Sequence, residues 1–386
     1  MALSIVNTPT SQAAYYQEAY TIEESSSGIY GVADFKFIAV VKNGAGTQLA
    51  KFKFPIYPNS TNKGVVNVKR ILETQVTSYF DLDLKNNSAA PCLEYDVEFG
   101  KYYSGSESLN EVSSSGWVAN GMSGVLDKVP LVDFTERDIH DSELGWLYYN
   151  TFTAYVPLVN SETARYKSYS ADGTLLKTVE TGAGLQLEGR QRKVPVGANA
   201  TAYASSVLSG SLPLIDPAAA YYTIEFGSYE QAIYYGNPIR YNRINTCSQY
   251  EGYTLNWLNA KGGFDSWYFQ FKRIDSYEIQ RQTMKRQRWE LDGNVYAENT
   301  HKHAITNYIN KSRQVITLNS DNLTTEQAEF LKGLFFSPEV YLLDGVDYYP
   351  VNVQADGYEQ KKNINDDVFN VTVRCLISDF ERTQRL

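Results

Sequence analysis

Apolar and polar residues alternate with a period of two along much of this 386-residue chain, and this alternation restricts the possible fold more than any other feature. Residues 35–41 alternate, Asn43-Gly44 follows, and the pattern resumes over residues 49–54. A similar arrangement surrounds Asp172-Gly173, between residues 165–169 and 175–179. Successive side chains of a strand face opposite sides of a sheet, and these dipeptides favour tight turns, so both stretches predict β-hairpins. We therefore expect a mainly β fold.

An internal repeat indicates how this β structure is organised. Val97-Glu98-Phe99-Gly100 recurs as Ile224-Glu225-Phe226-Gly227, and the two hairpin turns are separated by nearly the same interval. Chance reuse of short strand sequences is one explanation, and duplication of a domain is the other. We predict two β-sandwich-like domains related by duplication, with Phe99 and Phe226 buried in corresponding strands and Gly100 and Gly227 at strand ends.

The predicted boundaries divide the chain into four parts. An N-terminal arm covers residues 1–28, two β-sandwich-like domains cover residues 29–140 and 150–237, and a β-rich C-terminal domain covers residues 238–386. The arm is polar and has no clear period, so we expect it to become ordered only against a neighbour. The C-terminal domain should contain one helix over residues 324–335, because Thr324 and Gln327 fit a capping box and Ser337-Pro338 ends the apolar stripe.

Composition and charge exclude several classes of protein. Hydrophobic residues make up 43% of the chain and charged residues 20%, which is typical of a folded protein. The net charge of −9 disfavours general binding to nucleic acid, and no apolar run approaches the roughly 18 residues of a membrane span. The N-terminus lacks the pattern of a secretion signal. Cys92, Cys247 and Cys375 form no CxxC framework, and we interpret them as reduced core thiols, with a free reactive thiol as the alternative.

The search for catalytic motifs predicts that the chain is not an enzyme and holds no cofactor or metal. The chain has three histidines, and His301 and His303 lack a third ligand at a recognised spacing. Asp81-Leu82-Asp83 resembles the start of a calcium loop, but Asn86 stands where that loop needs glycine. No nucleophile-elbow, zinc-protease or phosphate-binding motif occurs. Two pairs of carboxylates, Asp81 with Asp83 and Asp344 with Asp347, are interpreted as turn and strand-edge residues.

The surplus of aromatic residues, with 31 Tyr, 17 Phe and 5 Trp, points to contact surfaces. Candidate interface residues lie in the N-terminal arm, in a Ser/Gly-rich segment over residues 104–124 that we expect to be an exposed loop, and in a basic stretch that ends at Trp289. They are Tyr15, Tyr16, Tyr20, Trp117, Arg281, Lys285, Arg286 and Arg288. The basic stretch could meet nucleic acid, or it could face acidic surface in this chain or in a neighbouring subunit. The acidic average favours the second use.

Several longer strings carry a resemblance to a known family. Residues 52–59, 64–72 and 95–100 resemble the first domain of tail structural proteins of tailed bacteriophages of Bacteroidetes, including crAss-like phages. The likeness continues in residues 256–265 and in the closing helix, the Asp344-Gly345 hairpin and the last strand. These strings are structural turns and strands, so no catalytic residue is carried over.

The resemblance implies a virion protein of the ring, hub, distal-tail or baseplate kind, assembled in the cytoplasm of the host bacterium. Its implied partners are further copies of itself, in a ring of six-fold or twelve-fold symmetry, and other tail or portal-proximal proteins. Residues 150–237 match least well, which leaves open an adhesin-like accessory role. The alternative function is therefore a carbohydrate-binding or carbohydrate-active β-protein, because Tyr and Trp also stack on sugars.

Overall fold

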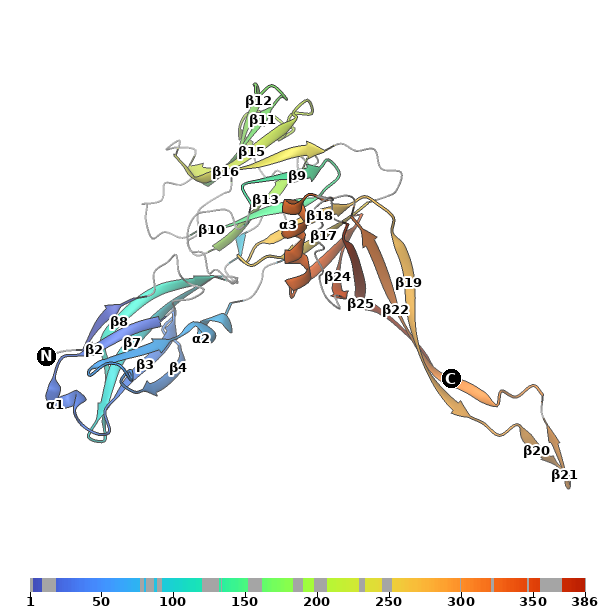
Figure 1. The fold of residues 1–386 in the computed structure, drawn as a ribbon, viewed down its shortest axis with the longest axis horizontal. Helices are drawn as coiled ribbons and strands as arrows, with labels where there is room; N and C mark the ends of the chain where they lie inside the picture. The colour runs from blue at the N-terminus through green and yellow to red at the C-terminus, as the bar shows by residue number, and fades with distance from the viewer. Residues whose placement is uncertain are drawn as a thin grey trace. The chain divides into compact units, whose positions relative to one another are not determined.

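The structure is a computed structural model (Figure 1). It describes residues 3–8, 19–76, 80, 87–88, 92–119, 132, 134–151, 162–182, 190–197, 207–228, 233–244, 252–298, 300–320, 323–345, 347–354 and 370–385. The described chain is built mainly of antiparallel strands, so the expected mainly β fold is confirmed. It separates into two compact units, residues 1–245 with 258–266, and residues 246–257 with 267–386.

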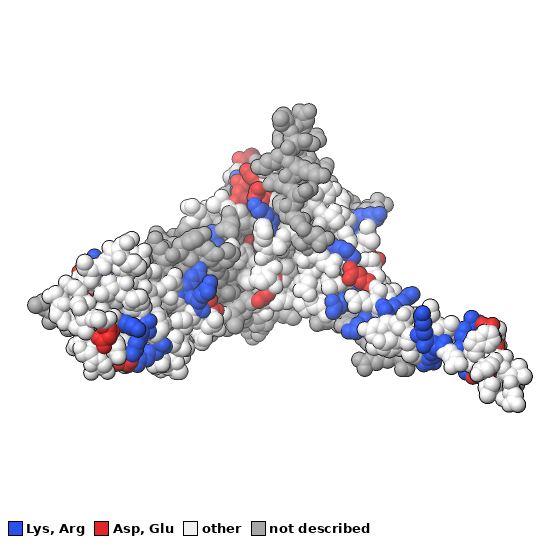
Figure 2. Space-filling view, turned by 60° about the horizontal axis from the view of Figure 1, so that its bottom comes forward, with Lys and Arg blue, Asp and Glu red and all other residues white. Residues whose placement is uncertain are grey.

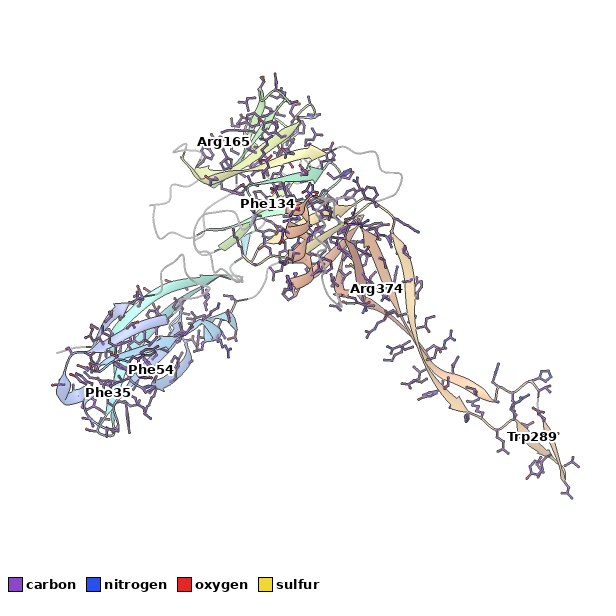
Figure 3. All side chains as sticks on the ribbon, in the orientation of Figure 1. Phe35, Phe54, Phe134, Arg165, Trp289 and Arg374 are labelled. Carbon is purple, nitrogen blue, oxygen red and sulfur yellow. The ribbon has the colours of Figure 1, made fainter. Side chains whose placement is uncertain are left out.

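The first sandwich consists of a four-stranded and a three-stranded sheet that share one core. The four-stranded sheet has the order β4-β3-β7-β8, with β3 (Lys36–Asn43), β4 (Gln48–Phe54), β7 (Cys92–Tyr103) and β8 (Ser106–Ala119). The other has the order β1-β2-β5, with β1 (Leu3–Asn7), β2 (Ala19–Glu24) and β5 (Lys63–Asn67). The helices α1 (Ser27–Tyr30) and α2 (Lys69–Glu73) are short. Inward-facing residues of both sheets fill the core, which includes Phe35 and Phe54 (Figure 3).

The second sandwich also packs a large sheet on a three-stranded one. The large sheet has the order β14-β12-β11-β15-β16-β9, with β9 (Glu136–His140), β11 (Glu162–Tyr169), β12 (Leu175–Gly182), β14 (Val207–Ser209), β15 (Tyr221–Ser228) and β16 (Ile233–Ile244). The small sheet has the order β10-β13-β6, with β6 (Asn87–Ser88), β10 (Gly145–Thr151) and β13 (Arg190–Val196). Leu147 and Val194 of the small sheet join Tyr166, Ile224 and Phe226 of the large sheet in one core.

The two sandwiches correspond strand by strand. The series β2, β3, β4, β5, β7 and β8 has the same order and pairing as β10, β11, β12, β13, β15 and β16. Ala39 lies opposite Phe99 in the first sandwich, and Ala164 lies opposite Phe226 in the second. All four side chains are buried. The predicted equivalence of the two domains, with both phenylalanines in corresponding strands, is therefore confirmed.

The predicted strand ends at the two glycines are only half correct. Gly227 is the penultimate residue of β15, whereas Gly100 lies inside β7, at a register shift between β7 and β8. A Cβ atom at Gly100 would lie 2.1 Å from the backbone oxygen of Ser108. Glycine is needed there because the backbone of β8 approaches too closely for any side chain.

The predicted domain boundaries also differ from the structure. The supposed N-terminal arm contributes β1 and β2 to the first sandwich, where Leu3, Tyr20 and Ile22 are core residues. Residues 106–119, within the expected loop, form the edge strand β8. The strand β9 pairs with β16 in the second sandwich, and β16 runs past residue 237. The errors at β2 and β9 share one cause, because these strands pair with β5 and β16, which are distant in sequence, whereas β8 forms a hairpin with the adjacent β7.

The C-terminal unit is organised around a seven-stranded sheet. Its order is β18-β17-β23-β24-β25-β22-β19, with β17 (Tyr253–Leu258), β18 (Phe264–Phe269), β19 (Ile274–Lys285), β22 (Ile305–Asn319), β23 (Val340–Asp344), β24 (Asp347–Gln354) and β25 (Thr372–Arg385). The helix α3 (Thr325–Phe336) has the predicted capping box of Thr324 and Gln327. Its buried Leu331 and Leu334 belong to the core around Trp257, and Cys375 is buried in the same core as predicted.

Candidate interaction surface

One hairpin of the C-terminal unit continues beyond the body of its sheet (Figure 1). Strands β19 and β22 pair from Ile274 opposite Thr317 to Lys285 opposite Ile305, and β25 accompanies β22 until Arg385 pairs with Ile309. Beyond them, β20 (Trp289–Asp292) and β21 (Val295–Glu298) form a separate two-stranded sheet. We call residues 274–314 the β-arm. Figure 3 shows Trp289 near its far end.

The β-arm exposes an unusual concentration of large apolar side chains. Of the seventeen large hydrophobic side chains exposed in the described chain, nine belong to the β-arm. They are Ile274, Tyr277, Ile279, Trp289, Leu291, Val295, Tyr296, Ile305 and Tyr308. Isolated two-stranded ribbons are at best marginally stable in water, and large exposed apolar surface marks contact sites. The β-arm therefore has the composition of a surface that is covered by a partner.

Three of the four exposed apolar side chains at the tip of the β-arm lie on one face. Leu291 lies directly opposite Tyr296, and Trp289 lies two residues before Leu291 on the same side of the strand. These side chains are 62%, 70% and 52% exposed, respectively. Ion pairs accompany this tip, with Arg288 Nη2 2.9 Å from Glu298 Oε1 and Lys302 beside Glu290. Arg288 and Lys302 are thus paired with glutamates of the tip itself, and one face of the tip is apolar.

The stretch between the β-arm's base and its tip is basic. Residues 281–288 contain four cationic side chains and no carboxylate, in a chain whose net charge is −9. We call Arg281, Lys285 and Arg286 the basic stem; all three are exposed, and none forms an ion pair with another described side chain. Figure 2 shows Lys and Arg side chains gathered along the β-arm. The backbone N–H of Arg286 donates to the oxygen of Ala304 at 2.8 Å, which fixes the strand that carries them.

The structure brings together only part of the predicted interface. Arg281, Lys285, Arg286 and Arg288 lie along the β-arm, whereas Tyr20 is 1% exposed in the core of the first sandwich. The expectation that Tyr20 contacts a neighbour is therefore wrong, because β2 buries alternate residues against β5 and β7. Tyr15, Tyr16 and the side chain of Trp117 lie outside the described residues.

Sequence reasoning overlooked most of the apolar part of the β-arm. Tyr277, Ile279, Leu291 and Tyr296 received no assignment, although the sequence contains a usable signal. The segment 274–285 has strand-forming residues but no continuous apolar face, which is typical of a strand without a core beneath it. His301 and His303 lie exposed in the β-arm, and no group of three or more His, Cys, Asp or Glu in the described chain could hold a metal ion.

Comparisons with known proteins add little. No protein-family model matches the chain, and no curated protein sequence matches it. The solved structures that it resembles include native E. coli alpha-2-macroglobulin (9% identity, TM-score 0.17, 96% of this chain and 25% of that one) and the plexin A4 extracellular region (9%, 0.18, 97% and 39%). The chain therefore spans well under half the length of either. Among the described helices, none combines the length and apolar character needed to cross a membrane.

Proposed function

We propose that this protein is a structural component of the tail of a tailed bacteriophage, which assembles through protein–protein contacts made by its β-arm. The observation that carries the proposal is the concentration of exposed apolar side chains on a ribbon without a core of its own. The resemblance of residues 52–59, 64–72 and 95–100 to phage tail structural proteins supplies the setting. A chain that repeats around a tail axis needs two different faces that fit each other, and a protruding arm is one such face.

A carbohydrate-binding role is the second candidate, and one feature of the second sandwich favours it. Tyr169 and Tyr221 stack with their ring centroids 4.9 Å apart on the outer face of the large sheet. The guanidinium of Arg240 lies 3.9 Å from the centroid of the Tyr221 ring. Because these contacts already occupy the faces of Tyr221, that ring has little surface left for a sugar. Assembly is the better-supported function.

Sedimentation velocity and negative-stain imaging of the purified chain test the proposal. The wild-type protein should form closed rings or stacked discs. A variant with serine at Trp289, Leu291 and Tyr296 should remain folded by circular dichroism and lose the assembly, because it removes the apolar tip. The matched control places serine at Leu175 and Leu176, which are also exposed, and it should assemble normally. A wild-type chain that stays monomeric and gains thermal stability from glycans would refute the proposal.

A further inference from the structure

A row of carboxylates on the first sandwich complements the charge of the β-arm. Glu94, Asp96 and Glu98 alternate along β7 and therefore lie on its outer face, since Tyr95 and Val97 between them point into the core. We call these three residues the acidic strip. On the neighbouring edge strand β8, the partners of Asp96 and Glu98 are Ser115 and Ser113. These short side chains leave Asp96 and Glu98 open on that side.

The acidic strip is only partly neutralised by described cations. Lys42 forms an ion pair with Glu98, whereas Glu94 and Asp96 have none with any described side chain. Glu107 of the same sandwich, in contrast, is fully paired. Glu107 Oε2 lies 2.6 Å from Lys51 Nζ and its Oε1 lies 2.8 Å from Lys53 Nζ; these hydrogen bonds lower the pKa of Glu107 to about 2. The acidic strip thus retains charge that its own sandwich leaves uncompensated.

The duplicated second sandwich provides an internal comparison for this charge. Glu225 stands at the position of Glu98, and it pairs with both Arg165 (2.6 Å) and Lys167 (3.1 Å). Lys167 corresponds to Lys42, so this pair occurs in both sandwiches. The position of Arg165 is occupied by a valine in the first sandwich.

The other two positions of the acidic strip also differ between the two sandwiches. Glu94 and Asp96 correspond to Tyr221 and Thr223 in the second sandwich. The same strand framework is therefore stable without these two carboxylates. They are not required by the fold, and their presence needs another explanation.

We propose that the basic stem of one copy docks on the acidic strip of a second copy of the same chain. This inference rests on the proposed function and assigns its contact. Arg281 and Lys285 are four residues apart on β19, as Glu94 and Glu98 are on β7, so both pairs span about 13 Å along a strand. Opposite charges with equal spacing favour this partner over nucleic acid, which the net charge of −9 disfavours. The contact is heterologous, as a closed ring requires.

Charge reversal tests the docking directly. The stem variant carries Arg281→Glu and Lys285→Glu, and the strip variant carries Glu94→Lys and Asp96→Lys. Each should raise the dissociation constant of self-association at least about tenfold. A variant with all four substitutions should restore much of the assembly. The control, Lys36→Glu with Lys332→Glu, changes the net charge by the same amount as the stem variant and should assemble normally.

A mixing experiment separates contact between copies from contact within one chain. Neither variant should assemble alone, but in a mixture of the two the basic stem of the strip variant can dock on the acidic strip of the stem variant, and the reversed stem can dock on the reversed strip. The mixture should therefore assemble with the two variants in alternation. Wild-type assembly should also weaken between about 0.05 M and about 0.5 M salt.

Several outcomes would overturn the inference. If the variant with all four substitutions fails to recover, or the mixture of the two variants does not assemble, the docking is wrong even if the tip variant confirms assembly through the β-arm. If the wild-type chain never associates, both this inference and the proposed function fail.

Discussion

Replacing Ile22 with alanine should severely destabilise the first sandwich. Ile22 lies on β2 and is 0% exposed in a core shared with Phe37, Val97 and Phe99. Truncating a buried isoleucine to alanine costs about 2–5 kcal/mol, because it loses burial and leaves a cavity. This loss is a large part of the roughly 5–15 kcal/mol by which ordinary domains are stable. The N-terminal strands β1 and β2 are thus part of the core of the first sandwich.

Hydrogen exchange resolved by residue is the suitable assay, because a chain with several domains need not unfold in one step. Amides of β3 and β7 should lose protection in Ile22→Ala, while amides of the second sandwich keep theirs. Val6→Ala, at a position 49% exposed on β1, is the matched control and should change stability by less than about 0.5 kcal/mol. If Ile22→Ala costs no more than the control, the N-terminal strands do not belong to this core.

Three further substitutions or reactions test other parts of the structure. Lys101→Met should cost about 3–5 kcal/mol in chemical denaturation, because the buried Glu24 carboxylate loses its ion pair at 3.0 Å; a cost below about 1 kcal/mol would contradict this. Burial raises the pKa of Cys375 to about 12, so a thiol reagent should react there only on unfolding. Above the ordinary thiol pKa of about 8.5, stability should fall with pH, since the unfolded chain ionises first. Gly100→Ala should lower the melting temperature, whereas Gly28→Ala, which meets no neighbour, should not.

Local sequence signals predicted the parts of the fold that local interactions determine. The hairpins around Asn43-Gly44 and Asp172-Gly173 and the helix capped by Thr324 form as expected, because turn and cap residues act within a few positions. The repeat of Glu-Phe-Gly also located corresponding strands, since the same residues fill the same core position in both sandwiches.

Long-range pairing was beyond these signals. The strand β2 has only six residues and pairs with β5, so its alternation was too short to distinguish it from a polar arm. The β-arm posed a different difficulty. Tyr277 and Ile279 are residue types that usually face a core, but in this structure they are exposed. A single sequence does not reveal whether the apolar residues of a strand pack in a core of their own chain or against another molecule.

The comparison between the two sandwiches shows where function can have entered this chain. Both keep the alanine opposite phenylalanine and the lysine that pairs with the strand glutamate, so these features belong to the shared framework. They differ on the outer faces of β7 and β15, where Glu94 and Asp96 of β7 correspond to Tyr221 and Thr223 of β15. A core residue cannot change without disturbing its neighbours, but an outer position can change at little cost to folding. The divergent outer face is therefore where a duplicated domain can acquire a partner, and the basic stem is the described surface whose charge complements it.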